Sequence, residues 1–255
     1  MTGFTFRGER LLLDPAGALV WPRLGLLAVA DLHLEKGSAC AGRGQLVPPW
    51  DSAATLARLA GLVTRHAPRT IVAVGDSFHD AHAAARLSPA DAALLATIGQ
   101  AAQIVWVRGN HDPLPPAGVA GICCETFAAD GLLFRHQALA SGHNPSGAPG
   151  EVSGHFHPKA RVSTRAGEIV RPCFMTDAAR IMLPSFGAYT GGLDVRSPAI
   201  ARHFIQGGQA FLLGRDKVFC FSVAAAGQDT LPVGCKTAAA AQPGVAGGGR
   251  RPRYS

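Results

Sequence analysis

Five short segments of this chain place side chains that can bind a metal ion directly after a run of apolar residues. Apolar runs of this length form buried strands, so each run would deliver its polar residues at a strand end. The carboxylate, carboxamide and imidazole groups concerned are ligands that divalent ions use in hydrolytic sites. In chain order the polar residues are Asp31 and His33, Asp76, Asn110 to Asp112, His136, and His155 and His157.

The spacing of these residues favours a centre with two metal ions. Two divalent ions about 3.5 to 4 Å apart need one carboxylate that reaches both of them. Asp31 and His33 lie two residues apart, so in an extended segment both side chains face one ion. Asp76, at the end of the next strand, is the natural bridging ligand, and Asn110, His155 and His157 add further ligands.

The elements that must position these residues alternate between strand and helix up to residue 107. Apolar runs at 24–30, 71–74 and 104–107 predict buried strands. Between them, Asp51 is a plausible N-cap for a helix that ends before Pro68, and Ser88 followed by Pro89 predicts the start of a second helix. Repeated βαβ units form a parallel sheet, whose ligands gather at the carboxyl ends of the strands.

After Asn110 the chain changes character. Short β-like runs separated by Gly and Pro predict a second, largely antiparallel sheet that packs on the first. Residues 140–150 are rich in Ser, Gly and Pro and are predicted to be a mobile loop. We therefore expect one α/β domain at residues 1–225, followed by a disordered Ala/Gly/Pro-rich tail at 226–255.

The composition is that of a globular protein with a mild positive charge. Of 255 residues, 47% are hydrophobic and 16% charged, and the net charge is +7, of which the tail contributes +3 (four basic residues against Asp229). A balance of this size permits a polyanionic partner without requiring one. The six cysteines include no C-x-x-C pair, which argues against a thiolate zinc site or a disulfide framework. With no apolar run long enough to span a bilayer, we expect a soluble cytoplasmic protein that has no membrane partner.

The order of the motifs, D-x-H, G-D, G-N-H-D, a lone His and G-H-x-H, resembles that of the calcineurin-like metallophosphoesterases. The longer strings at 30–37, 75–80 and 185–192 look like those of the ligase-associated DNA damage response endonucleases, and the resemblance covers about Phe4 to Val223. The G-D motif departs from the commonest form of the superfamily, because His79 stands where an aspartate is usual.

The resemblance implies a fold of two packed mixed β-sheets flanked by helices, in α-β-β-α layers. It implies two divalent ions, Mn²⁺ foremost with Fe or Zn²⁺ as alternatives, and a metal-bridging hydroxide as nucleophile. Asp31, His33, Asp76 and His157 would hold the first ion, and Asp76, Asn110, His136 and His155 the second. For the lone histidine we favour His136 over His143, because His136 follows an apolar run whereas His143 lies in the predicted mobile loop.

The same resemblance gives catalytic roles to the residues after Asn110. His111 would stay free to act on the leaving group, and Asp112 would orient its imidazole. The implied substrate is DNA, cleaved during repair beside a DNA ligase, a helicase and an exonuclease. Two alternatives stay open: a phosphoesterase for nucleotides or other small phosphoesters, and a non-catalytic scaffold with the same fold. The sequence does not indicate the oligomeric state.

Overall fold

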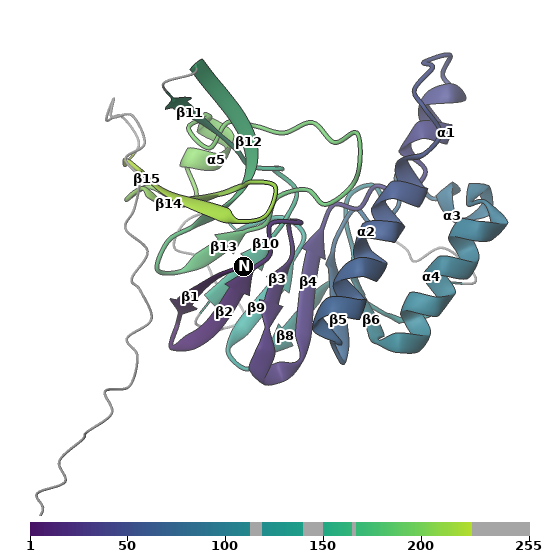
Figure 1. Cartoon of the computed structure of the whole chain (residues 1–255), viewed down its shortest axis with the longest axis horizontal. Coiled ribbons are helices and arrows are strands. Elements are labelled where there is room, and N and C mark those ends of the chain that lie inside the picture. Colours follow the sequence, from purple (N-terminus) through teal and green to yellow (C-terminus); the bar gives the residue numbers. More distant parts are fainter. Residues whose placement is uncertain (113–118, 140–149, 165–166, 226–255) are drawn as a thin grey trace, which may run out of the picture.

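The computed structural model describes residues 1–112, 119–139, 150–164 and 167–225. Its architecture is two β-sheets packed face to face, with the two long helices on the outer face of the first sheet (Figure 1). Of the mobile loop predicted at 140–150, residues 140–149 lie outside the described residues and Gly150 begins a strand. The predicted tail at 226–255 also lies outside the described residues. Within the described part of the chain, no helix has the length and apolar character needed to cross a membrane.

The first sheet has seven strands, of which the last four are parallel. Ala30 lies opposite Val74, and Val74 opposite Val107, so the carboxyl ends of three central strands meet at one edge. The predicted strand at 24–30 begins only at Leu26, after a short 3-10 helix. In order across the sheet, the strands are β1 (Thr2–Phe6), β2 (Glu9–Leu13), β3 (Leu19–Trp21), β4 (Leu26–Ala30), β5 (Thr70–Val74), β6 (Gln103–Val107) and β7 (Ile122–Cys124), and η1 (Pro22–Leu24) precedes β4.

Helices α2 (Asp51–His66) and α4 (Pro89–Ala101) cover the outer face of this sheet. Leu56 and Leu59 of α2, with Leu95 of α4, belong to the apolar cluster that packs on the sheet. The predicted start of α4 is confirmed, because the Ser88 hydroxyl accepts a hydrogen bond from the Asp91 N–H. Three short helices complete the set: α1 (Lys36–Ala41), α3 (Ala83–Arg86) and α5 (Pro198–Ala201).

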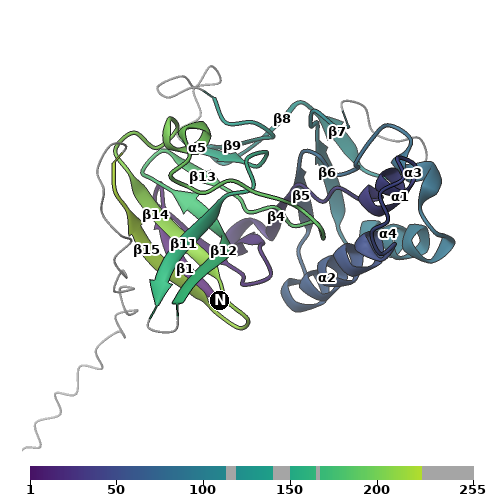
Figure 2. The same cartoon turned by 90° about the horizontal axis from the view of Figure 1, so that it is seen from above.

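The second sheet is mixed: most of its strand pairs are antiparallel, as the sequence predicts, and two central pairs are parallel. Its strands are β8 (Thr126–Ala129), β9 (Leu132–Arg135), β10 (Gly150–Ser153), β12 (Gly167–Thr176), β13 (Arg180–Met182), β14 (Gly208–Leu213) and β15 (Val218–Val223), in the order β15-β14-β12-β13-β10-β9-β8. β9, β10 and β13 run parallel to one another. β11 (Lys159–Thr164) pairs with the first half of β12 as a ribbon that projects on the far side from α2 and α4 (Figure 2).

The interior between the sheets is aromatic and aliphatic. Phe6 and Trp21 from the first sheet and Phe134, Phe174 and Phe211 from the second are all buried in one cluster. Because close-packed side chains of this size fix the spacing of two sheets, the strand ends of both sheets are held at a constant separation. A third apolar cluster lies on the outer face of the second sheet, under α5 and β11.

Two local expectations are wrong. The glycines at 37, 42 and 44 predict a loop, but residues 36–41 form α1. Asp51 is the first helical residue of α2 rather than its N-cap. Both differences have one cause: the Asp51 carboxylate accepts a hydrogen bond from the Gly37 N–H at 3.0 Å and so holds the start of α1 against α2.

Candidate metal centre

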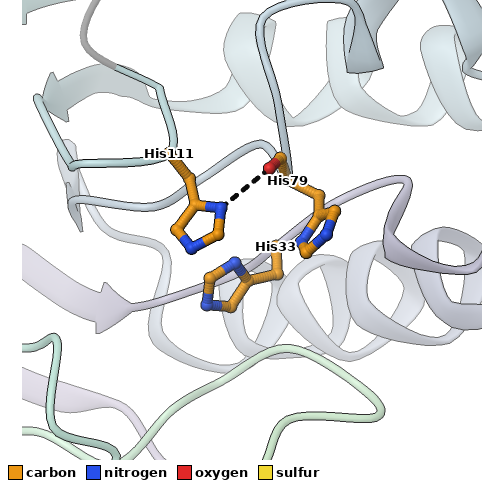
Figure 3. Close-up of side chains that lie close together, drawn as sticks. All are labelled: His33, His79 and His111. Carbon is orange, nitrogen blue, oxygen red and sulfur yellow. Dashed lines mark hydrogen bonds between the residues drawn. The ribbon is translucent and has the colours of Figure 1, made fainter. Parts of the chain in front are cut away.

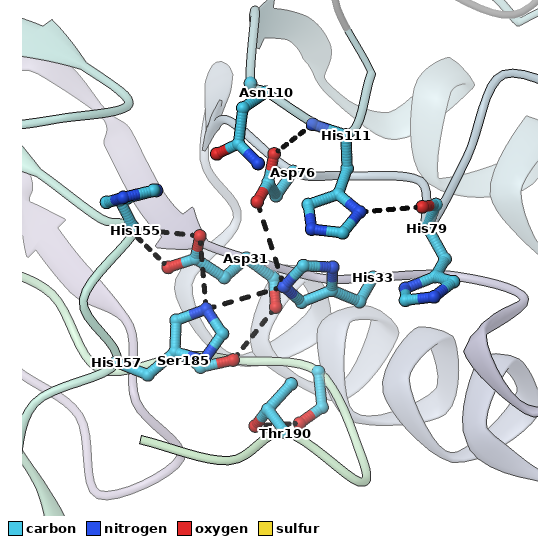
Figure 4. Close-up of polar contacts among 12 residues, drawn as sticks. Asp31, His33, Asp76, His79, Asn110, His111, His155, His157, Ser185 and Thr190 are labelled. Carbon is cyan, nitrogen blue, oxygen red and sulfur yellow. Dashed lines mark hydrogen bonds and ion pairs between the residues drawn. The ribbon is translucent and has the colours of Figure 1, made fainter. Parts of the chain in front are cut away.

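The polar residues that follow the central strands lie together at one edge of the packed sheets (Figure 4). Asp31 directly follows β4, and Asp76 comes two residues after β5. From the second sheet, His136 follows β9 and His155 comes two residues after β10. Because each strand pair is parallel, its carboxyl ends share one edge of the sheet. Contacts of His136 with Asp76 and of His157 with Asp31 bring the two edges together.

One group of side chains consists of Asp31, His33 and His157, whose ligand atoms lie within 4.8 Å of one another. Nε2 of His157 is 3.4 Å from Nε2 of His33 and 3.5 Å from Oδ1 of Asp31. Asp31 and His33 are buried. These residues are three of the four that the sequence predicted for the first ion.

A second group consists of Asp76, His136 and His155. Nε2 of His136 lies 3.4 Å from Oδ2 of Asp76 and 3.0 Å from Nδ1 of His155. The same nitrogen is 2.9 Å from Oδ1 of Asn110. The four residues predicted for the second ion are thus neighbours.

Asp76 lies between the two groups. Its Oδ2 is 3.9 Å from Nε2 of His33 and 3.4 Å from Nε2 of His136. The position suits a carboxylate that contacts two ions at once. Its other oxygen accepts the N–H of His111 at 2.9 Å, which fixes the orientation of the carboxylate.

His33 and Asp76 have the protonation states that metal ligands need. Burial lowers the pKa of His33 to about 3, although the nearby Asp76 charge opposes this, so the imidazole is neutral and offers a lone pair. Burial acts to raise the pKa of Asp76, but the hydrogen bond and charge of His136 hold that pKa below its ordinary value. Asp76 is therefore ionised at neutral pH.

The contacts among these side chains fit divalent ions. Nε2 of His136 has three polar neighbours, on Asn110, His155 and Asp76, but one imidazole nitrogen carries only one proton or one lone pair. Nδ1 of His33 is buried without a hydrogen-bond partner. A cation that accepts several lone pairs at once satisfies this arrangement, and a set of imidazole and carboxylate ligands suits Mn²⁺, Fe or Zn²⁺.

The backbone carries strain at this site. Five of the predicted ligands have positive φ although none is glycine, and such conformations cost about 1–3 kcal/mol each unless the surroundings enforce them. The surroundings do so here: the His33 N–H donates to the Asp76 carbonyl at 2.8 Å, and the Ser185 hydroxyl donates to the Asp31 carbonyl at 3.0 Å. The five residues and their φ values are Asp31 (55°), His33 (45°), Asp76 (46°), His155 (71°) and His157 (47°).

His111 is exposed beside the two groups, and its Nδ1 lies 2.9 Å from the carbonyl oxygen of His79 (Figure 3). The ring stacks on that of His79 with centroids 5.2 Å apart and meets the His33 ring edge-on at 5.1 Å. With Nδ1 directed at a carbonyl, Nε2 is the nitrogen left to meet a ligand.

Asp112 does not orient the His111 imidazole as predicted. Its carboxylate accepts hydrogen bonds from three backbone N–H groups, of Ser77 at 2.7 Å, Phe78 at 3.1 Å and Gly109 at 3.1 Å. Burial raises its pKa to about 6 against the lowering effect of these N–H groups. The contacts make Asp112 a clamp between the loops that follow β5 and β6.

His79 is a site residue whose place the sequence indicated only indirectly. It forms a third group with His33 and His111, in which the ligand atoms lie within 4.8 Å of one another. Burial lowers its pKa, and the neighbouring His111 and Lys36 charges act in the same direction. The only signal in the sequence was its position three residues after Asp76, where the superfamily usually has an aspartate.

This fold and this site define the class of protein. The family model of the calcineurin-like phosphoesterases matches residues 24–173, and the chain belongs to that family. The matched range contains each predicted ligand, from Asp31 to His157. The protein is a metal-dependent phosphoesterase, that is, a hydrolase of phosphate esters.

Among solved structures, the chain is similar to that of the Pseudomonas putida nuclease MPE, with 28% identity and a TM-score of 0.65 over 85% of this chain and 98% of that one. A predicted phosphoesterase from Streptococcus pneumoniae matches with 14% identity and a TM-score of 0.33 (82% of this chain, 95% of that one). The phosphoesterase Yfce from E. coli matches with 15% identity and the same TM-score (78% and 92%). A comparison with curated proteins gave no match.

Proposed function

We propose that this phosphoesterase is a two-metal phosphodiesterase that cleaves DNA. The observation that carries the proposal is the position of Asp76, whose carboxylate lies within 4 Å of imidazoles from both ligand groups. The similarity to a nuclease over 98% of that protein's length favours a nucleic acid over a small phosphoester as substrate.

Each predicted residue has a definite task in this reaction. Asp31, His33, Asp76 and His157 would hold one ion, and Asp76, Asn110, His136 and His155 the other. When bound, two such ions, Mn²⁺ by preference, activate water and neutralise the phosphoryl oxygens during displacement. The Asp31 and Asp76 carboxylates leave the loaded centre with excess positive charge, which attracts a phosphodiester.

His111 is proposed to act on the leaving group. The carbonyl of His79 accepts a hydrogen bond from Nδ1 and fixes the ring, so Nε2 of the protonated imidazole can donate its proton to the departing oxygen. Its exposure leaves room for a substrate strand. No acidic side chain has to take part in this proton transfer.

A role in DNA repair, beside a DNA ligase, a helicase and an exonuclease, rests on the resemblance of the strings at 30–37, 75–80 and 185–192 to the ligase-associated endonucleases. In the structure these strings line the metal centre: Asp31, Asp76 and Ser185 lie in one constellation (Figure 4). The competing function, hydrolysis of nucleotides or other small phosphoesters, uses the same centre and differs in the substrate alone.

The test is hydrolysis of single-stranded, nicked and duplex DNA beside bis-p-nitrophenyl phosphate and nucleotides. Each reaction is run with added Mn²⁺, Fe²⁺ or Zn²⁺ and with a chelator. We expect DNA cleavage that needs the metal. Turnover of nucleotides with inert DNA would instead establish the small-phosphoester function, and inertness toward every ester would establish the scaffold.

His111→Ala separates the proposed acid from the ligands. It should lower DNA cleavage by about 10²- to 10⁴-fold, the usual worth of a general acid, while the protein keeps both ions. Metal content by mass spectrometry and turnover are measured on the same preparation. Loss of an ion in this variant would make His111 a ligand and refute its role as the acid.

A further inference from the structure

A short arm of chain beside the metal centre carries two positive charges. This α1 arm consists of α1 and the segment that follows it, residues 36–50, and it projects beyond the end of α2 (Figure 1). Most of the arm after Cys40 is exposed, including Arg43 and Trp50. The proposed function assigns no catalytic or metal-binding role to the residues of this arm.

The base of the arm is fixed relative to the first ligand group. The Lys36 N–H donates to the carbonyl of His33 at 3.3 Å, and the Gly37 N–H donates to Asp51 at 3.0 Å. A Cβ at Gly37 would lie 2.5 Å from the Asp51 carboxylate, so the close approach needs glycine. The Ser52 hydroxyl donates to the buried Glu35 carboxylate at 2.8 Å, which links the start of α2 to the residue before α1.

Arg86 ties the arm to the loop that carries His79. Its guanidinium donates to both oxygens of Asp80, at 3.0 and 2.7 Å, and to the Ser38 hydroxyl at 2.9 Å. Asp80 directly follows His79. The arm therefore keeps its place beside the His33, His79 and His111 rings.

The charge of the arm is unbalanced. Residues 36–50 include Lys36 and Arg43 but no Asp or Glu. Neither cation forms an ion pair with an acidic side chain in the described part of the chain. Lys36 lies beside the site, because its backbone N–H donates to the carbonyl of the predicted ligand His33. A strand that follows the arm away from the site therefore meets positive charge that no acidic residue of the arm balances.

We propose that Lys36 and Arg43 bind backbone phosphates of a nucleic-acid strand next to the phosphate held at the metal centre, and that Trp50 stacks on one of its bases. The inference rests on the proposed function in taking a polymer as substrate. A small phosphodiester has no second phosphate, so the arm contributes only when a polymer is bound.

Trp50 is the feature that favours a nucleic acid over other polyanions. Its side chain is 67% exposed at the base of the arm, where Trp50 directly precedes α2. A base has an aromatic face for which an exposed indole is the matching surface, whereas an acidic peptide or a polyphosphate has none.

The test is the salt dependence of binding, because each phosphate contact releases counterions. Binding of a fluorescent single-stranded phosphorothioate oligonucleotide, which resists cleavage, is followed by anisotropy with Mn²⁺ present, between 50 and 300 mM salt. Lys36→Ala and Arg43→Ala should each reduce the slope of log K against log salt by about 0.7. Trp50→Ala should weaken binding about fivefold or more without changing the slope, and Trp50→Phe should restore most of it.

Arg10→Ala is the matched control. Arg10 is an exposed cation on β2, near the edge where β4 begins rather than the edge from which Asp31 emerges, so its removal should leave the slope unaltered. Thermal melting checks that each variant is folded.

Equal slopes for Lys36→Ala, Arg43→Ala and the unsubstituted protein would overturn the inference, and so would an unsubstituted protein that fails to bind the oligonucleotide. The proposed function is judged separately, by cleavage with metal. Metal-dependent cleavage of DNA together with unaltered slopes would support the proposed nuclease function and refute the role of the α1 arm in binding DNA.

Discussion

The loops that follow β4 and β5 are braced by each other, whereas the loop that follows β10 is braced by the opposite sheet. In the first sheet, the His33 N–H donates to the Asp76 carbonyl and the Leu34 N–H to that of Ser77. From the second sheet, the His155 N–H donates to the Asp31 carboxylate at 3.0 Å.

The two sheets also differ in what they supply. Both carboxylates among the predicted ligands come from the first sheet, and three of the four imidazoles come from the second. The first sheet therefore provides the charge and the second most of the imidazoles, so the full set of predicted ligands is together only when the sheets are packed. A change at the contact between the sheets should harm the second group of ligands before the first.

Asp76→Asn should have the largest effect, because Asp76 serves both groups. If Asp76 bridges the two ions as proposed, loss of its charge weakens both sites, and we expect turnover of bis-p-nitrophenyl phosphate to fall by about 10³-fold. Metal content should fall with it, measured by mass spectrometry after gel filtration. If both ions and near-normal turnover survive, the two groups do not share this residue.

Gly75→Ala tests the contact between the sheets. Gly75 has a φ of +72°, and a Cβ there would lie 2.2 Å from Nδ1 of His136. The displaced imidazole should weaken one of two Mn²⁺ sites by about 10- to 100-fold, the range for disturbed ligand support. Calorimetric titration should resolve one weakened and one normal site. Two unchanged sites would show that the second group does not depend on this contact.

Asp112→Asn tests the bracing within the first sheet. An amide presents a donor where the carboxylate accepts from three N–H groups, so the free energy of unfolding should fall by about 1–3 kcal/mol. Urea denaturation measures the change. A reduced kcat with unaltered stability would contradict the clamp and restore the predicted role of Asp112 in orienting His111.

Gly61→Ala gives the smallest effect and serves as the glycine control. Gly61 lies inside α2, and a Cβ there meets no heavy atom within 4 Å. Replacing a helical glycine should raise the free energy of unfolding by about 0.5–1 kcal/mol, without altering metal affinity. A loss of metal affinity in this variant would mean that α2, and not the contact between sheets, governs the site.

The strands and long helices could be predicted because their signals are local. Apolar runs end where polar residues begin, as at Ala30 and Asp31, and Ser88 with Pro89 marks a helix start that the structure keeps. The residues predicted as ligands come together for the same reason: parallel strands in register end at the same edge.

What could not be predicted depends on distant contacts. Helix α1 is a glycine-containing stretch that Asp51 and Ser52 hold in place, and Asp51 alone looks like a cap for its own helix. The clamp at Asp112 needs N–H groups from a loop 35 residues away. The positive φ of the predicted ligands could not be predicted from their residue types, because Asp and His occur throughout the chain.

The bracing of Asp31 by Ser185 joins two parts of the chain that the ribosome makes far apart in time. The Ser185 hydroxyl and the Gly187 N–H both donate to the Asp31 carbonyl, and Ser185 lies 154 residues further along the chain. A polypeptide still being synthesised holds the first-sheet ligands long before these supports emerge from the ribosome. Contacts of such sequence separation form late in folding, so hydrolytic activity should begin only when nearly the whole domain has been made.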